Sequence, residues 1–246
     1  MYDTVHVDEK LFYMTQVRRS FYLLPGEPEP ERSVRSRRYI TKVMMLAAVA
    51  RPRWVPFDGK LGIWAFVVRE PALRSSYRRP TGTMETKEGR VNKETYRVML
   101  IERLLPALRE QMPHAAEGKR ITVQQNNASP HISPQDPAFC EATSRMRLSV
   151  ELQFQPPNSP ALNALDLGIF TTIQLRQMLR SPRSIDELVD SVSEAYWELP
   201  HSTLNAAFLS LQCSIDSCIK DKGSNNFKPR HISKSKLERG ATSYQH

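Results

Sequence analysis

Apolar positions in the first third of the chain follow the short spacings typical of β-strands. Val5 and Val7 alternate with polar residues up to the acidic pair Asp8 and Glu9, which is predicted to end the first strand. Longer apolar runs predict further strands, two of them joined by the turn-like residues 56–60. The strands are predicted at 2–8, 11–17, 39–52 and 61–68.

The helical period first appears after Asn92, which is a good N-cap residue. Apolar residues then recur every three or four positions as far as Leu108, with a bend predicted at Pro106. Two more strands are predicted at 119–127 and 147–154, and three helices at 165–179, 184–199 and 204–219. Antiparallel strands followed by alternating helices and strands predict an α/β fold, with a mixed sheet flanked by helices.

The 246 residues are enough for one α/β domain with insertions, predicted over 1–219 and followed by a basic tail at 220–246. Basic, turn-prone loops are predicted at 24–38 and 74–83. The formal charge of +9 suits a polyanionic partner such as nucleic acid, because Lys and Arg neutralise phosphates. Solubility alone would also explain this charge.

Cysteine usage and hydropathy indicate a soluble intracellular protein with no membrane partner. Cys140, Cys213 and Cys218 are odd in number and form no CxxC pair, so a reducing compartment is favoured over a disulfide framework. The longest apolar run, 43–50, is too short to cross a bilayer, and the first ten residues lack the layout of a signal peptide.

Three polar motifs fall at predicted strand ends or at a helix start. They are VHVDEKLFY with Asp8, VQQNNASPH with Asn126, and QPPNSPALNALDLGIF with Asp166. Acidic side chains that converge from separate elements bind divalent cations. Asp166 is expected in the first helical turn, on the protein-facing stripe of Ile169 and Phe170. Taken singly, Asp8 is better explained as a strand-end charge and Asp166 as a first-turn acid; the metal-site interpretation depends on the three motifs together.

These motifs, in this order and spacing, resemble those of mariner-like transposases, whose patterns are close to VHxDEKWF, QQDNAxPH and PPNSPDLNxLDLGxF. The 39 residues between positions 126 and 166 match the plant-type subgroup. The resemblance extends over nearly the whole chain, through segments such as KVMMLAAVARPRW, FDGKLGIWAF, SIDELVDSVSEAYWELP and NNFKPRHISK.

The resemblance implies a ribonuclease-H-like fold whose catalytic positions here are Asp8, Asn126 and Asp166. Family members hold two Mg²⁺ or Mn²⁺ ions, cut transposon ends by phosphodiester hydrolysis and join the 3′ hydroxyl to target DNA. The implied partner is therefore DNA, the implied location the nucleus, and a homodimer is one arrangement that the resemblance allows. His131 matches the family's histidine, and it either contacts the site or braces its loop.

Other polar residues flank the three catalytic positions. Glu9 and Asn127 are candidate auxiliary residues beside His131. Strand-end solvation is the expected role of His6 and Glu9.

Three residues depart from the family pattern, namely Leu11, Asn126 and Ala161. The first and last are expected to alter packing or a local cap. Asn126 replaces a carboxylate with a neutral amide, so it is expected to hold a metal weakly and to impair catalysis.

The chain begins at the first catalytic strand, so the family's upstream helix-turn-helix modules are expected to be absent. The basic loops would then contact the DNA backbone without sequence preference, or would simply be solvated. Their arginines are Arg32, Arg35, Arg37, Arg38, Arg74, Arg78 and Arg79.

Three functions remain open on the sequence. The first is a transposase-derived DNA-processing domain whose catalysis is impaired. The second is a non-catalytic protein that binds DNA or another partner through its basic loops and tail. The third is an active hydrolase that needs only Asp8 and Asp166 for one metal ion.

Overall fold

The computed structural model describes residues 1–15, 40–52, 57–77, 79–115 and 117–223. The predicted basic loop at 24–38, with its four arginines, lies outside these residues, as do Arg78 and most of the predicted tail. No helix in the described part of the chain is long and apolar enough to cross a membrane.

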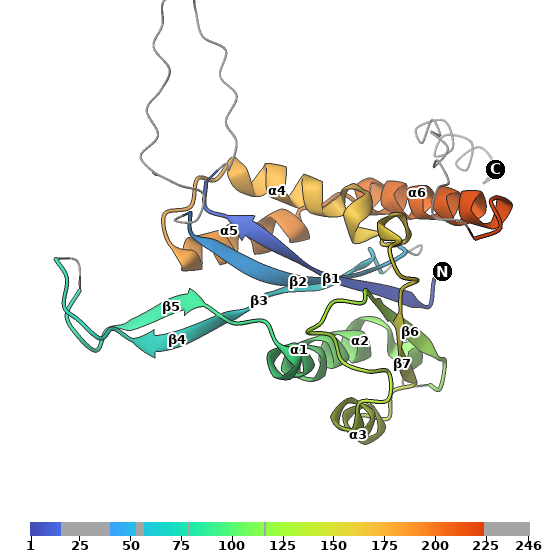
Figure 1. The fold of residues 1–246 in the computed structure, drawn as a ribbon, viewed down its shortest axis with the longest axis horizontal. Helices are drawn as coiled ribbons and strands as arrows, with labels where there is room; N and C mark the ends of the chain where they lie inside the picture. Colours follow the sequence, from blue (N-terminus) through green and yellow to red (C-terminus); the bar gives the residue numbers. More distant parts are fainter. Residues whose placement is uncertain (16–39, 53–56, 78, 116, 224–246) are drawn as a thin grey trace, which may run out of the picture.

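A five-stranded mixed sheet forms the centre of the domain, in the order β3-β2-β1-β6-β7 (Figure 1). Its strands are β1 (Thr4–Tyr13), β2 (Lys42–Ala50), β3 (Lys60–Ala65), β6 (Ile121–Gln125) and β7 (Val150–Phe154). The first three strands pair antiparallel, whereas β6 runs parallel to both β1 and β7. The predicted α/β fold with a mixed sheet is confirmed.

One continuous strand, β1 (Thr4–Tyr13), runs through the gap between the strands predicted at 2–8 and 11–17, so the predicted break at Asp8 and Glu9 is wrong. The two acidic residues remain in the ladder, opposite Ala47 and Leu46 of β2. Charged residues end a strand when their side chains need water. Here each side chain has polar partners inside the fold, so the strand continues.

Helices cover both faces of the sheet (Figure 1). On one face lie α1 (Lys93–Met99), a π-helical turn (Leu100–Leu104), α2 (Leu105–Gln111) and α3 (Pro137–Arg145). On the other lie a π-helical turn (Leu165–Ile169), α4 (Phe170–Met178), α5 (Ile185–Trp197) and α6 (His201–Lys220). Short 3₁₀ turns occupy Pro113–Ala115 and Pro160–Leu162. Because side chains alternate along a strand, β1 supplies both cores: Val5 and Val7 to the first, Phe12 to the second.

Helix boundaries follow the capping residues in the sequence. The Asn92 side chain accepts a hydrogen bond from the Thr95 backbone N–H, and Ser184 does the same for Glu187. The departure from regular α-helix comes at the π-helical turn just before Pro106, because proline cannot donate to the helical ladder. Helix α3 was not predicted, although Asp136 caps it and Pro137 opens it, a sequence signal for a helix start.

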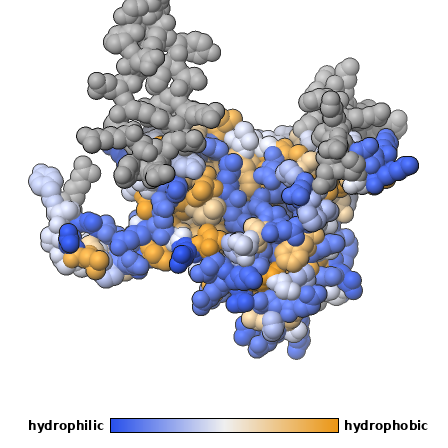
Figure 2. All heavy atoms as spheres, viewed as in Figure 1, coloured by the Kyte–Doolittle hydropathy of each residue, from blue (hydrophilic) through white to orange (hydrophobic). Residues whose placement is uncertain are grey.

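The strand predicted at 61–68 is divided between two sheets. After β3, the buried Phe66 bonds to Met44 of the main sheet, and the chain then enters a separate hairpin of β4 (Val67–Pro71) and β5 (Met84–Glu88). This hairpin projects from the domain (Figure 1), and its mostly hydrophilic surface carries a few apolar side chains (Figure 2). The predicted basic loop at 74–83 joins its strands.

Tyr196 of α5 is fully buried and ties the helix to the sheet. Its hydroxyl donates to the Ala48 carbonyl at 2.7 Å and accepts from the Gly62 N–H at 3.0 Å. Nearby, the Lys60 ammonium donates to the Trp197 and Leu199 carbonyls that end the same helix. The face that carries the second core is therefore fixed to the sheet by buried polar contacts as well as by apolar packing.

We expect Tyr196→Phe to lower the free energy of unfolding by about 1–3 kcal/mol, because two buried backbone groups lose their partner. Denaturant unfolding followed by circular dichroism measures this change. Tyr77→Phe is the matched control, since Tyr77 is fully exposed in the hairpin. Equal stability of the two variants would contradict the proposed anchoring role of Tyr196.

Candidate active site

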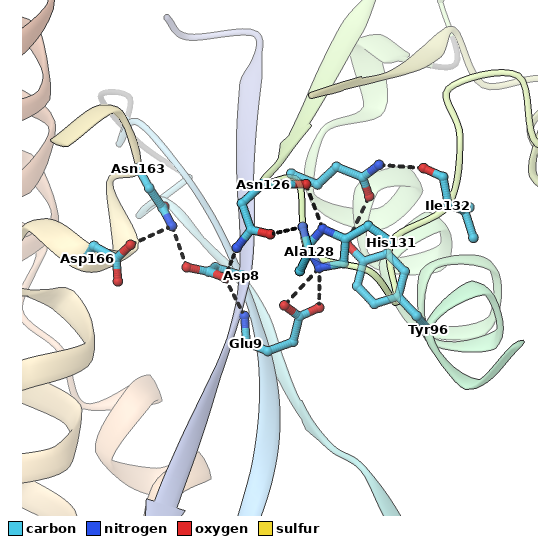
Figure 3. A network of polar contacts seen from close by, with 10 residues as sticks. Asp8, Glu9, Tyr96, Asn126, Ala128, His131, Ile132, Asn163 and Asp166 are labelled. Carbon is cyan, nitrogen blue, oxygen red and sulfur yellow. Dashed lines mark hydrogen bonds and ion pairs between the residues drawn. The ribbon is translucent and has the colours of Figure 1, made fainter. Parts of the chain in front are cut away.

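The three residues singled out by the motifs meet at the centre of the sheet (Figure 3). β1 and β6 pair in parallel with His6 opposite Gln124, and the same register places Asp8 beside Asn126, directly after β6 ends. Asp166 approaches from the π-helical turn before α4. Asp8 thus lies within a strand, and only Asn126 lies at a strand end.

Asp8 is 6% exposed and accepts hydrogen bonds from three N–H groups. Its Oδ1 accepts from the Asn126 side-chain Nδ2 and from the Glu9 backbone N–H, each at 2.9 Å. Its Oδ2 accepts from the Asn163 Nδ2 at 2.5 Å. The carboxylate is therefore enclosed by donors.

Asn126 turns its amide nitrogen, not its oxygen, toward Asp8. Its Oδ1 accepts from the Ala128 N–H at 2.8 Å, which leaves only Nδ2 to face the carboxylate. Its neighbour Asn127 points elsewhere, because its side chain donates to the Gln155 carbonyl at 2.7 Å and links the ends of β6 and β7. Asn127 braces this edge of the sheet.

Asp166 does not share the buried stripe of Ile169 and Phe170 as predicted, because its side chain is exposed. The first turn is not a regular α-helix: Leu167 leaves helical geometry and Gly168 has a φ of 116°. Asp166 lines the same groove as Asn126, the residue that follows β6. Asn163, which sequence reasoning missed, donates to Asp166 Oδ2 at 3.2 Å as well as to Asp8. Its place just before a helix start was the available signal.

Glu9 faces the opposite side of the sheet from Asp8 and pairs with His131 at 3.0 Å. The other ring nitrogen of His131 bonds to the Asn126 backbone carbonyl at 2.8 Å, and Tyr96 stacks on the ring. The Asn126 carbonyl can only accept, so the ring nitrogen that faces it donates. Burial lowers the pKa of His131, but the hydrogen bond and charge of Glu9, the Asn126 carbonyl and the charge of Asp8 together outweigh it, so the pKa is raised. His131 therefore braces the loop that carries Asn126.

The solvated strand-end role expected for His6 and Glu9 is wrong. The Glu9 side chain is 9% exposed and paired with His131. His6 is buried edge-on against Phe208 of α6, and burial lowers its pKa to about 4, so it is neutral at physiological pH.

Burial raises the pKa of both remaining acidic residues, Asp8 and Asp166. Burial, followed by the charges of Asp166 and Glu9, raises the pKa of Asp8 to about 7. Burial also raises the pKa of Asp166, opposed by Lys10 and by the bond from Asn163. Ionisation of Asp8 is thus unfavourable in this environment, although three donors accompany it.

A polar groove of about 260 Å³ opens beside the acidic residues. It is lined by Asn126, Asn127, Gln155, Pro156, Asn158, Ser159, Pro160, Asn163 and Asp166. The two carboxylates do not fit a two-metal site, because amide N–H groups point at Asp8 where a cation needs oxygen lone pairs. Within the described residues, no three His, Cys, Asp or Glu side chains are grouped to hold an ion.

Of the arginines expected to contact DNA, the two that the structure describes, Arg74 and Arg79, do not lie at this site. Arg74 and Arg79 lie in the loop at the far end of the projecting hairpin (Figure 1), where Arg79 pairs with Glu85. The other arginines, at 32, 35, 37, 38 and 78, lie outside the described residues.

The sequence matches no protein-family model and no curated protein. The fold, however, is similar to solved structures of a ribonuclease-H-like transposase domain. Comparison with the transposase in a pre-cleavage Mos1 transpososome gives a TM-score of 0.63 at 17% identity, over 91% of this chain and 56% of the other. The Mos1 transposase paired-end complex with the left transposon end gives a TM-score of 0.59 at 17% identity, over 91% of this chain and 56% of the other.

The isolated catalytic domain of Mos1 mariner transposase is similar over 83% of its own length, with a TM-score of 0.56 and 16% identity. The chain therefore has the ribonuclease-H-like fold of the mariner transposase catalytic domain, and the predicted fold class is confirmed. It spans little more than half the length of the chains in the two DNA complexes.

The raised pKa of Asp8 predicts a pH-dependent stability. Because the folded pKa is about 7 and the ordinary value 3.8, the folded state binds more protons than the unfolded state between these values. Asp8 therefore lowers stability as pH rises from about 4 to about 7, by at most about 4 kcal/mol. Unfolding free energies across this range should fall more steeply for the natural chain than for Asp8→Asn. Parallel pH profiles would contradict the shift.

Proposed function

We propose that this chain is a mariner-like, transposase-derived DNA-processing domain. Its ancestral chemistry would be metal-dependent cleavage of DNA strands and their transfer to target DNA. The observation that carries the proposal is the meeting of Asp8, Asn126 and Asp166, from three separate elements, beside a groove on the fold that Mos1 transposase shares. The transposon-end complex of Mos1 supports DNA as the partner. The nucleus as the place of action is part of the proposal.

We further propose that catalysis is impaired in this chain. The middle position holds a neutral amide whose N–H faces Asp8, so the negative charge available to Mg²⁺ or Mn²⁺ is reduced by one. Loss of a metal ion that activates the attacking oxygen or stabilises the leaving one costs several powers of ten in rate. Asp8 and Asp166 keep their carboxylates, but both oxygens of Asp8 accept hydrogen bonds from side-chain amides.

A second candidate is a non-catalytic protein that binds DNA or another partner, alone or as a homodimer. The formal charge of +9 and the basic hairpin loop favour it, because such binding needs no metal site. It is compatible with the enclosed carboxylates, whereas an active one-metal hydrolase would need them accessible.

We expect the natural chain to cut nicked DNA substrates in Mn²⁺ or Mg²⁺ only at background rate, and Asn126→Asp to cut at least about 100-fold faster. Asp8→Ala in the Asn126→Asp background should abolish the gain, and gel analysis of end-labelled DNA measures each rate. Robust cutting by the natural chain that depends on Asp8 would contradict the proposed impairment.

DNA binding through the hairpin loop should depend on salt. If Arg74 and Arg79 each contact a phosphate, replacing both with Ala lowers the slope of log K against log salt by about 2. Fluorescence anisotropy with duplex DNA at several salt concentrations gives this slope. Arg145→Ala in the C-terminal turn of α3 serves as a charge control. An unchanged slope in the double variant would exclude the hairpin as a DNA contact.

A further inference from the structure

The acidic centre is held together by amide groups. We propose that Asn126 and Asn163 make it a metal-independent hydrogen-bonded junction, in which side-chain N–H groups take the place of cations. This inference rests on the proposed descent from a metal-binding site and goes beyond the loss of activity. It assigns both amides a structural role, as positioning residues for Asp8 and Asp166.

The orientation of Asn126 follows from its two neighbours. The Ala128 backbone N–H is a donor, so only the amide oxygen can face it, and the distance is 2.8 Å. The amide nitrogen then faces Asp8 Oδ1 at 2.9 Å. A reversed amide would place donor against donor at Ala128 and oxygen against carboxylate at Asp8. The natural residue therefore fits a buried carboxylate without a cation.

The orientation of the Asn163 amide is likewise set by a backbone N–H that can only donate. Its Oδ1 accepts from the Leu165 N–H at 3.0 Å, so its nitrogen is directed to the acids. That nitrogen lies 2.5 Å from an oxygen of Asp8 and 3.2 Å from an oxygen of Asp166. One amide thus donates to two carboxylates that would otherwise repel each other.

The junction joins three parts of the chain that are distant in sequence. Asp8 belongs to β1, Asn126 follows β6, and Asn163 begins the turn that leads to α4 (Figure 3). With Asp at position 126, one oxygen would still accept from Ala128, while the other would face Asp8 as a second acceptor. Such a centre needs a cation to be stable, whereas the natural centre has donors where that cation would be required.

The test compares melting temperatures at pH 8, with EDTA or with millimolar Mn²⁺ or Mg²⁺, for the natural chain and three variants. Asn126→Asp adds the carboxylate, and Asn126→Ala removes the donor without adding charge. Asn92→Asp is the matched control, because the Asn92 side-chain oxygen only accepts hydrogen bonds at its helix cap and Asp preserves them. Calorimetric titration with Mn²⁺ reports binding independently of melting.

We expect the natural chain and Asn92→Asp to melt at temperatures that divalent ions leave unchanged, with no stoichiometric binding. Asn126→Asp should melt at least about 5 °C lower in EDTA and recover with Mn²⁺. Asn126→Ala should melt lower than the natural chain by a few degrees and show no metal recovery. If Asn126→Asp fails to fold in any condition, the melting temperatures of Asn126→Ala and the natural chain in EDTA test the inference.

Two results would overturn the inference: stoichiometric Mn²⁺ binding that stabilises the natural chain, or unchanged melting of Asn126→Ala in EDTA. Neither would by itself refute the transposase-derived function, which the DNA cleavage and binding assays test. Conversely, a metal-independent natural chain whose Asn126→Asp variant binds Mn²⁺ but cuts no DNA would support the junction and count against the ancestral activity.

Discussion

The parallel pairing of β1 with β6 is the constraint on which the candidate site depends. It sets a register in which Asp8, in the middle of one strand, lies beside Asn126, at the end of the other. The antiparallel pairing of β1 with β2 on its other edge keeps β1 central and buried. A carboxylate is costly in such a position unless donors surround it. The hydrogen bonds from Asn126, Asn163 and Glu9 therefore belong to the stability of the sheet as much as to its chemistry.

The alternation of side chains along β1 divides the polar residues into two networks. Asp8 faces the helices α4 to α6 and meets Asn163 and Asp166, whereas Glu9 faces α1 and meets His131. Asn126 connects the two, because its side chain bonds to Asp8 and its backbone carbonyl to His131. The loop after β6 is consequently held from both faces of the sheet. This double support explains why an unusual residue can be accommodated at position 126 without loss of the local fold.

Much of the fold follows from local patterns in the sequence, since apolar spacing and capping residues such as Asn92 and Ser184 mark real helix starts. The predictions that failed are those in which residues distant in the sequence determine the local structure. Asp8 and Glu9 suggest a strand end until their partners, more than a hundred residues away, are known. The irregular geometry at Gly168, just after Asp166, is not apparent from apolar spacing, and the role of Asn163 depends on the position of Asp8. Motif text locates the three site residues, but it does not give the direction in which an amide points.

The orientation of the Asn126 amide distinguishes two interpretations of asparagine at this position. Asn and Asp have nearly the same shape, so exchange between them conserves packing while reversing hydrogen-bond polarity at one atom. At position 126 the oxygen that both residues share is bound to Ala128, and the atom that differs faces Asp8. The amide that would weaken metal binding in the proposed function also supplies a hydrogen-bond donor to the buried Asp8. The proposed loss of catalysis and the proposed metal-independent acidic centre would therefore have a single cause, the amide at position 126.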